Sequence, residues 1–502
     1  MRVVEVGKRT IGVADVVAVA RAGAAVRIAP AVTARLKRAR KIVERFAAGD
    51  RAIYGLNTGL GAAVDTTLGR NEVADFQQQA LMARAVGVGE FLATDEVRAT
   101  LFVRLIGISR GASGLSPAFA TVIRDMLGKG LHPRARRIGT LGEADLSPLA
   151  ELFLPLVGRG QAELGGRVLT GRQALRKANI HPPTLGPKDA IALLNANAYS
   201  VGTGALALHD ANLALQAQTA AGALSLEAAG ANLSPIDPRV VALRGAPGQA
   251  DASRLLLSLV RGGDLMKKAR RPLRVQDPLS FRCLAPVNGA AFDQLARATA
   301  AIAADLNGAG DSPAVLIADE ELMSTVNFDT TAISLAFEGL GLALSHTAAI
   351  AVFRISKLMS PGFSGLPRFL TPKAGARTGF ATVQKTASAL EAEIRHLALP
   401  LGAMTAPVAD GVEDYAPMTP RVIEKTRGIV LRLARLAAIE LVVAAQAVDL
   451  HGGLNLGRGG TRIFAFVRKH VPMLDEDRPT GVEFERLAAA ILAGELRAVL
   501  TA

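Results

Sequence analysis

The stretch Gly139-Thr-Leu-Gly-Glu-Ala-Asp-Leu-Ser-Pro-Leu-Ala150 is the most informative part of the 502-residue sequence. Its serine, Ser147, is followed directly by Pro148, whose ring nitrogen has no N–H. Ser147 therefore cannot take part in a backbone cyclisation in which the amide nitrogen of the next residue attacks. Glu143 and Ala144, which precede Asp145, include neither a serine nor a glycine.

Two other stretches carry residues suited to chemistry on a small molecule. Tyr54-Gly-Leu-Asn-Thr-Gly-Leu-Gly61 is a glycine-rich loop with a phenol, and Gln276-Asp-Pro-Leu-Ser-Phe-Arg-Cys283 contains an arginine. The planar guanidinium of arginine can bind a carboxylate through two parallel hydrogen bonds. Together with residues 139–150, these stretches resemble the loops of the aromatic amino acid ammonia-lyase family, which includes the histidine and phenylalanine ammonia-lyases. The resemblance covers nearly the whole chain.

This resemblance implies a mainly α fold of the histidine ammonia-lyase type, with a long central helical bundle and a mixed N-terminal region. It also implies a homotetramer in which three chains build each active site. Residues 1–186 are expected to form the N-terminal region, and residues 187–502 the helical bundle of the oligomer core. Apolar residues at three- and four-residue spacing predict the long helices, over 190–218, 291–307, 331–358, 382–398 and 420–450.

Shorter signals predict local structure. Residues 1–17 have the pattern of a short β segment followed by a helix. Residues 165–171, which contain three glycines, predict a small hairpin or turn, and Thr170 can cap the helix after it. Thr419-Pro420 and Gly452-Gly453 mark the start and the end of the last long helix.

The loop at 139–150 departs from the family at its centre. In the family it reads Gly-x-x-Gly-Ala-Ser-Gly-Asp-Leu-x-Pro-Leu-Ala, and the Ala-Ser-Gly cyclises and dehydrates into the electrophile methylidene-imidazolone (MIO). Here Glu143-Ala144 stands in place of those three residues. Ala112-Ser113-Gly114 supplies the tripeptide elsewhere, but Ser and Gly before a helical run are ordinary capping residues, so we interpret it as a helix start. We expect a family member without MIO or any other cofactor.

The composition argues against several classes of protein. The formal net charge is +14, but only 4% of residues are aromatic and no basic-aromatic pattern of a nucleic-acid groove is present. The single cysteine, Cys283, and seven histidines without ligand spacing predict no metal site. Charged residues interrupt the N-terminal apolar runs, and the apolar stretch 436–448 is too short to span a bilayer. We expect a cytoplasmic protein that acts on an anionic small molecule, with neither nucleic acid nor membrane as a partner.

Three residues are candidates for catalysis. Tyr54 matches the family tyrosine that acts in proton transfer, and Glu413, in Glu-Asp-Tyr415, corresponds to the family glutamate that contacts the substrate ring or serves as base. Lys385 replaces an apolar residue beside the family glutamine on an inward-facing helix. The alternatives are a half-buried tyrosine in a mobile lid, a solvated loop carboxylate and a solvated surface lysine.

Five residues are candidates for substrate binding. The resemblance implies that Arg282, in the motif that begins at Gln276, holds the substrate carboxylate, and that Asn195 hydrogen-bonds the substrate. It also implies that Phe328 lines the ring pocket, and Arg84 occupies the place of a ring-contacting histidine. Asn195 could instead be a helix-start residue, and Phe328 a core residue. Leu279 replaces a family tyrosine next to the electrophile, so two features near the electrophile are missing together.

These departures favour a particular reaction. The electrophile acts through the lone pair of the substrate amine, which a trimethylammonium group lacks, because that group leaves directly as trimethylamine. The chain therefore resembles the ergothionase branch, which cleaves ergothioneine to thiourocanate and trimethylamine without MIO. One alternative is an ammonia-lyase or aminomutase on histidine or another aromatic amino acid. Another is a catalytically silent member that binds a small ligand.

Overall fold

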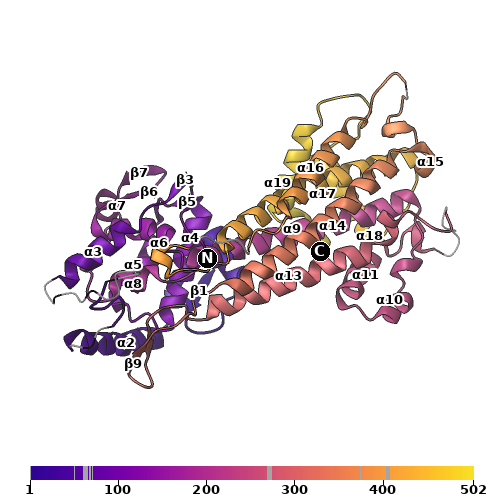
Figure 1. The fold of residues 1–502 in the computed structure, drawn as a ribbon. Coiled ribbons are helices and arrows are strands. Elements are labelled where there is room, and N and C mark those ends of the chain that lie inside the picture. Colours follow the sequence, from indigo (N-terminus) through magenta and orange to yellow (C-terminus); the bar gives the residue numbers. More distant parts are fainter. Residues whose placement is uncertain are drawn as a thin grey trace. The chain divides into compact units, whose positions relative to one another are not determined.

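The computed structural model describes residues 2–49, 51, 53–59, 66, 69, 72–267, 274–373, 375–402 and 407–501. Helices predominate in these ranges, and the strands form only small sheets (Figure 1), which confirms the mainly α fold. The chain forms two compact units. Unit 1 comprises Met1–His209, Thr299–Leu335 and Leu401–Ile423, and unit 2 comprises Asp210–Ala298, Ala336–Pro400 and Glu424–Ala502. The division expected near residue 187 remains a prediction.

Short helices and small sheets build most of unit 1. Its short helices are α1 (Val13–Ala20), α2 (Pro30–Ala48), α3 (Val73–Ala83), α4 (Thr94–Ser109), α5 (Pro117–Gly128), α6 (Leu146–Phe153), α7 (Gly171–Lys177) and α8 (Asp189–Leu194), with the 3₁₀ turns η2 (Leu154–Val157) and η6 (Ala409–Gly411). A parallel pair joins β1 (Val3–Val6) to β2 (Ala25–Ile28). The antiparallel pairings are β3 (Val88–Phe91) with β5 (Arg136–Ile138), β4 (Leu131–Pro133) with β6 (Gln161–Leu164), β6 with β7 (Arg167–Thr170), and β8 (Ala314–Leu316) with β9 (Glu321–Met323).

Local signals in the N-terminal region correctly predicted β1, α1, the hairpin of β6 and β7, and the start of α7. The first residues form β1 and then α1, as expected. The hairpin of β6 and β7 turns at Gly165 and Gly166, whose φ angles of 59° and 73° suit glycine. Thr170 caps α7 because its side chain accepts a hydrogen bond from the backbone N–H of Gln173.

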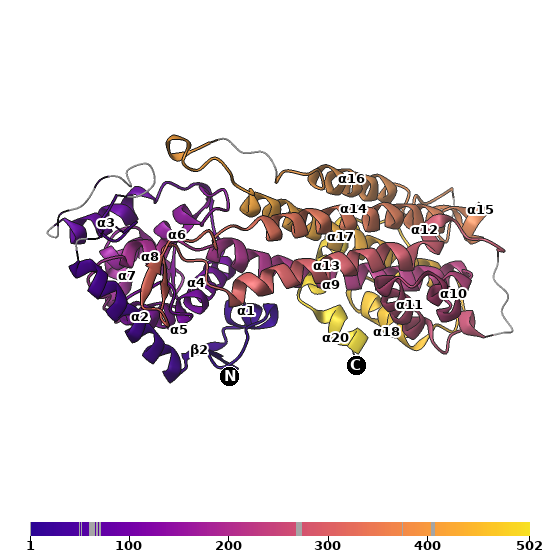
Figure 2. The same ribbon diagram turned by 60° about the horizontal axis from the view of Figure 1, so that its bottom comes forward.

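Four long helices each contribute residues to both units: α9 (Ala198–Ala229), α13 (Leu284–Asn307), α14 (Thr331–Leu358) and α17 (Thr419–His451). Within unit 2 they run side by side (Figure 1 and Figure 2). The last of these long helices, α17, starts and ends where Thr419-Pro420 and Gly452-Gly453 predicted. By length and composition, the segments 189–229 and 331–358 could each cross a membrane, but the apolar window of the first is entirely buried inside the structure.

Shorter helices complete unit 2. They are α10 (Pro238–Arg244), α11 (Pro247–Val260), α12 (Leu279–Arg282), α15 (Pro361–Ser364), α16 (Val383–Leu397), α18 (Arg458–His470), α19 (Gly481–Leu492) and α20 (Glu495–Thr501), with the turns η3 (Ser234–Ile236), η4 (Asp264–Met266) and η5 (Arg368–Leu370). One of them, α11, approaches the long helix α13 closely at glycines: a Cβ at Gly289 of α13 would lie 2.4 Å from the carbonyl carbon of Gly248 in α11.

A buried ion pair lies in the interior of unit 2. Glu440 of α17 accepts hydrogen bonds from Arg354 Nε (2.6 Å) and Nη2 (2.9 Å), and both side chains are fully buried. Ser225 Oγ (2.8 Å) and the side-chain amide of Gln218 also donate to Glu440. These partners satisfy a carboxylate that interrupts the apolar sequence of α17.

The helix predicted over 190–218 is wrong in one respect, since it is broken at residues 195–197. Asn195 has φ −81° and ψ 78°, and α9 begins only at Ala198. Other partners take the backbone groups at the break: Arg104 Nε donates to the carbonyl of Leu193 (3.1 Å), and the N–H of Asp145 donates to the carbonyl of Ala196 (2.8 Å). Tertiary hydrogen bonds therefore override the helical pattern here.

Candidate active site

The candidate site in unit 1 is an open cavity of about 520 Å³. Loops and helix ends from distant parts of the sequence form its walls. Its lining residues are Tyr54, Arg84, Glu143, Ala144, Leu146, Ile191, Asn195, Ser312, Ser324, Thr325, Val326, Phe328, Val412, Glu413, Asp414 and Tyr415. Five predicted site residues thus meet at one cavity: Tyr54, Arg84, Asn195, Phe328 and Glu413.

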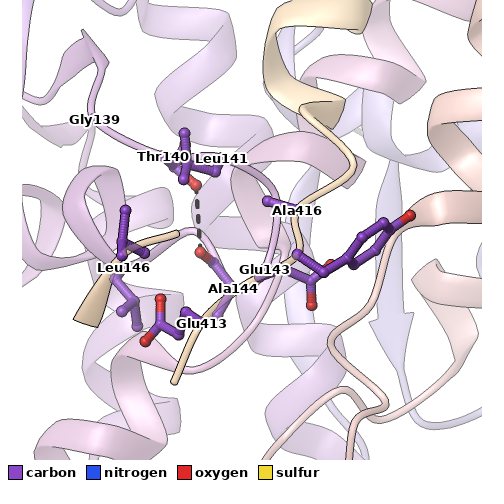
Figure 3. Close-up of a pocket in the computed structure, with 10 residues that line it drawn as sticks. Gly139, Thr140, Leu141, Glu143, Ala144, Leu146, Glu413 and Ala416 are labelled. Carbon is purple, nitrogen blue, oxygen red and sulfur yellow. Dashed lines mark hydrogen bonds between the residues drawn. The ribbon is translucent and has the colours of Figure 1, made fainter. Parts of the chain in front are cut away.

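A smaller chamber of about 180 Å³ adjoins this cavity (Figure 3). Its walls come from the loop at 139–146 and from residues 408–416. Glu143, Ala144, Leu146, Glu413 and Tyr415 line both spaces. The two glutamates therefore lie where the large cavity and the side chamber meet.

Buried hydrogen bonds anchor the loop. Asp145 is fully buried and accepts hydrogen bonds from Ser200 N (2.8 Å), Ser200 Oγ (3.0 Å) and Thr140 Oγ1 (3.1 Å). Burial raises the pKa of Asp145 to about 6, against the effect of these donors, which favour the carboxylate. Thr140 Oγ1 also lies 3.3 Å from the carbonyl oxygen of Ala144 (Figure 3), and Thr330 Oγ1 donates to the carbonyl of Gly142 (2.7 Å).

Glu143 has an unusual environment. Among the described residues, its buried Oε1 has no hydrogen-bond donor. Burial, together with the neighbouring carboxyls of Asp329 and Glu413, raises the pKa of Glu143 to about 8. At neutral pH the Glu143 carboxyl therefore holds a proton. The next residue, Ala144, has a strained backbone, because its φ of 61° lies in the left-handed region.

Arg84 supplies a positive charge beside two of the catalytic candidates. It follows α3, and its Nη1 donates to the carbonyl of Ala80 (3.1 Å). Burial lowers the pKa of Arg84, while Tyr54 and Glu413 are close enough to favour its charged form. The phenol, the carboxylate and the guanidinium therefore form one electrostatic group.

Asn195 and Phe328 are held by backbone contacts at the cavity. Asn195 Nδ2 donates to the carbonyl of Ser312 (2.6 Å), and the side chain of Asn197 donates to the carbonyl of Phe328. The helix break described above is what brings Asn195 to the cavity wall. Both residues line the same cavity, and their roles in substrate binding remain predictions.

Three predicted site residues belong to unit 2 and do not line this cavity. Gln276 is exposed, and Lys385 is exposed on the first turn of α16. Arg282 is half-buried at the end of α12, and its Nε donates to the carbonyl of Asp277 (2.7 Å). Leu279, on the same short helix, is 61% exposed. Their roles remain predictions.

Two residues at the site, Glu143 and Asp329, are not among those predicted from the sequence. Glu143 was noted only as part of what replaces the family tripeptide, although an acidic side chain in that position was itself a signal. Asp329 had no such signal, because only the structure shows that its carboxyl reaches Glu143. Within the described ranges, no three His, Cys, Asp or Glu side chains are placed to bind a metal ion.

The residues present do not fit the MIO group. Glu143 and Ala144 provide no hydroxyl to lose and no glycine nitrogen to attack. Ala112-Ser113-Gly114 does not line the cavity: Ser113 is fully buried, and Lys188 Nζ donates to its carbonyl (2.6 Å). The tripeptide lies in the turn before α5, whose N-cap residue is Ser116, so it precedes a helix but does not cap it. Leu60 and Gly61 of the tyrosine loop lie outside the described residues.

Comparison with known proteins decides the family. The sequence profile of the aromatic amino acid lyases matches residues 11–469. The chain belongs to the aromatic amino acid lyase family. It is 36% identical to the histidine ammonia-lyase of Symbiobacterium thermophilum over the full chain and 99% of that relative.

Solved structures of this family share the fold. Ergothionase from Treponema denticola, in complex with desmethyl-ergothioneine sulfonic acid, superposes with a TM-score of 0.93 at 29% identity, covering 98% of this chain and 99% of that one. Tyrosine aminomutase from Streptomyces globisporus has a TM-score of 0.94 at 28% identity, with 99% and 98% covered. The histidine ammonia-lyase fold is therefore confirmed, and the protein is a lyase of this family.

Proposed function

We propose that this lyase eliminates trimethylamine from ergothioneine, the trimethylated betaine of 2-thiohistidine, to give thiourocanate without MIO. The observation that carries the proposal is Glu143-Ala144 at the electrophile position of a cavity that otherwise keeps Tyr54, Asn195, Phe328 and Glu413. The likeness to ergothionase supports it.

The chemistry needs a base and a good leaving group. A base removes the β-proton, the electrons of that C–H bond form the new double bond, and the electrons of the C–N bond leave with trimethylamine. Tyr54 and Glu413 are the candidates for the base, and Arg84 beside them offsets negative charge. A quaternary ammonium already carries its positive charge, so no electrophile is required to activate it.

The unit 2 residues complete the proposed site in a homotetramer. We propose that Arg282 holds the carboxylate and that Lys385 polarises the thione-imidazole ring, which acidifies the β-proton. Both would come from neighbouring chains. The exposure of Lys385 and Gln276 in one chain supports this arrangement.

The first test is turnover of histidine, hercynine and ergothioneine by the purified protein, with the conjugated product followed by absorbance and the amine identified. Trimethylamine from ergothioneine alone supports the proposal. Ammonia from histidine would favour the second candidate function, that of an ammonia-lyase. The observation behind this candidate is the 36% identity to a histidine ammonia-lyase. No product from any of the three counts against both.

A variant tests the ring-polarising role. Lys385→Met should lower kcat on ergothioneine at least about 100-fold, because one positioned group that stabilises charge in the transition state typically contributes a rate enhancement of that size. The oligomer should be unchanged in sedimentation. Lys37→Met, at an exposed position of α2, is the control and should keep full activity. Full activity of Lys385→Met would rule out the role.

A further inference from the structure

Glu143 lies at the junction of the large cavity and the side chamber, in the place where the family forms its electrophile. It is half-buried, and its Oε1 is aimed at no donor among the described residues. The loop that carries it is fixed on both sides by Thr330 and Asp145. The anchored loop thus places a carboxyl group at the boundary of the two spaces.

Asp329 is the partner of Glu143, and Thr331 donates two hydrogen bonds to its carboxyl group. Its Oδ2 accepts a hydrogen bond from Thr331 Oγ1 (2.8 Å), and its Oδ1 accepts one from the N–H of Thr331 (3.2 Å). Tyr415 Oη lies 2.6 Å from the same threonine hydroxyl. A hydrogen bond between two carboxyl groups requires a proton between them, and the side chains of Glu143 and Asp329 form such a pair.

The charges that face Glu143 are predominantly negative. Asp329 and Glu413 lie close enough to interact with it, and Asp414 lines the same cavity. Asp305, behind Asp329, is another carboxyl, and burial raises its pKa to about 6. Arg84 and the phenols of Tyr54 and Tyr415 are the other titratable groups at the cavity among the described residues.

We propose that Glu143, paired with Asp329, binds the positively charged nitrogen of the substrate, and that the pair releases its shared proton to the solvent when the cation binds. The inference rests on the function proposed above, since a betaine places a permanent cation at this point. A neutral amine with a free lone pair suits an electrophile, whereas a cation with none suits a carboxylate. Phe328 on the same cavity can contribute a cation–π contact.

The ligand that isolates this subsite is glycine betaine, which has a carboxylate and a trimethylammonium but no β-carbon, so it cannot be eliminated. Its counterpart without the positive charge is 3,3-dimethylbutanoate, in which carbon replaces the nitrogen and only the carboxylate is charged. Calorimetric titration of the full-length oligomer at pH 7, in phosphate and in Tris buffer, gives the affinity and the number of protons released. Because Glu143 has a pKa of about 8, glycine betaine should release close to one proton per site, and 3,3-dimethylbutanoate none.

Variants assign the proton. Glu143→Gln should abolish the release and weaken glycine betaine binding at least about tenfold. The wild-type affinity should rise up to about tenfold per pH unit below pH 8, as the carboxyl ionises, and should be independent of pH in Glu143→Gln. Asp410→Asn, which removes an exposed carboxyl that lines neither space, is the control and should behave as wild type. Melting temperatures establish that each variant is folded.

The outcomes separate the subsite from the reaction. Proton release that persists in Glu143→Gln, or no binding of glycine betaine by the wild type, overturns the subsite even if ergothioneine is turned over. Release that depends on Glu143, without turnover of ergothioneine, keeps the subsite and overturns the proposed reaction. With ergothioneine as substrate, Glu143→Gln should raise KM more than it lowers kcat, as expected of a binding residue.

Discussion

Asp145 determines where the loop of the candidate site lies. It is fully buried, and three hydrogen-bond donors from Thr140 and Ser200 converge on it. The pKa of about 6 means that the folded protein binds a proton more tightly here than the unfolded chain does. Its contribution to stability therefore decreases as the pH rises from about 4 to about 6 and is constant above that range.

Asp145→Asn should be destabilising at pH 7.5. The side-chain NH2 of the asparagine would face a hydrogen-bond donor of Ser200 or Thr140, where the carboxylate of Asp145 accepts. We therefore expect a loss of about 1–3 kcal/mol in the free energy of unfolding, measured by urea denaturation. The loss should be larger at pH 5, because proton binding at Asp145 stabilises the folded wild type there and the variant lacks this gain. Asp319→Asn, at an exposed position, should change stability by less than about 0.5 kcal/mol. Equal losses at both pH values would contradict the argument.

Some residues of the candidate site could be predicted from the sequence and others could not. The positions of Tyr54, Arg84, Asn195, Phe328 and Glu413 followed from motif resemblance, and the structure places all five on one cavity. The environment of Glu143 could not be predicted, because its raised pKa depends on burial and on Asp329, which is 186 residues away in sequence. Charge coupling of this kind follows from tertiary distances, which the motifs do not encode.

At the scale of elements, helical periodicity predicted the long helices but not their interruption. The pattern over 190–218 continues through Asn195, because apolar residues occur on both sides of it. The break depends on Arg104, which reaches the carbonyl groups of α8 from another helix, and this contact has no local signal. The start and end of α17 were predictable because a proline and two glycines determine them locally.

The contact between α11 and α13 gives a prediction at this scale. Gly289→Ala would place a Cβ 2.4 Å from backbone atoms of Gly248, which cannot move aside cheaply, so we expect a loss of about 1–3 kcal/mol. Gly362→Ala in α15 meets nothing within 4 Å and should be neutral or slightly stabilising. Thermal unfolding of both variants makes the comparison. A Gly289→Ala protein as stable as wild type would show that the helices can separate without loss.

At the scale of the whole molecule, the exposed side chains of unit 2 favour assembly. On α14, Leu342 is 43% exposed and Phe353 is 62% exposed, and Leu279 near Arg282 is 61% exposed. Exposed apolar groups of this kind commonly mark surfaces that other chains cover. The tetramer remains a prediction, and so does the sharing of each active site among chains.

Co-expression of two inactive variants tests the sharing of sites. If Tyr54 and Arg282 of one site come from different chains, mixed oligomers of Tyr54→Phe and Arg282→Met should recover about a quarter of the activity on ergothioneine, since random assembly gives that share of intact sites. Tyr54→Phe with Glu413→Gln is the control, because both residues line the cavity of one chain and no intact site can form. Equal recovery in the two mixtures would exclude this arrangement.

The walls of the cavity run from Tyr54 to Tyr415 along the chain, and this order has a consequence for biosynthesis. The tyrosine loop is among the first segments that a ribosome makes, and the glutamate wall is among the last. At ordinary rates of translation, roughly 20 to 70 s separate the synthesis of the two walls. The early half of the site must therefore wait, without its opposite wall, until nearly the entire polypeptide has emerged, and a nascent chain that stops early can have no cavity of this kind.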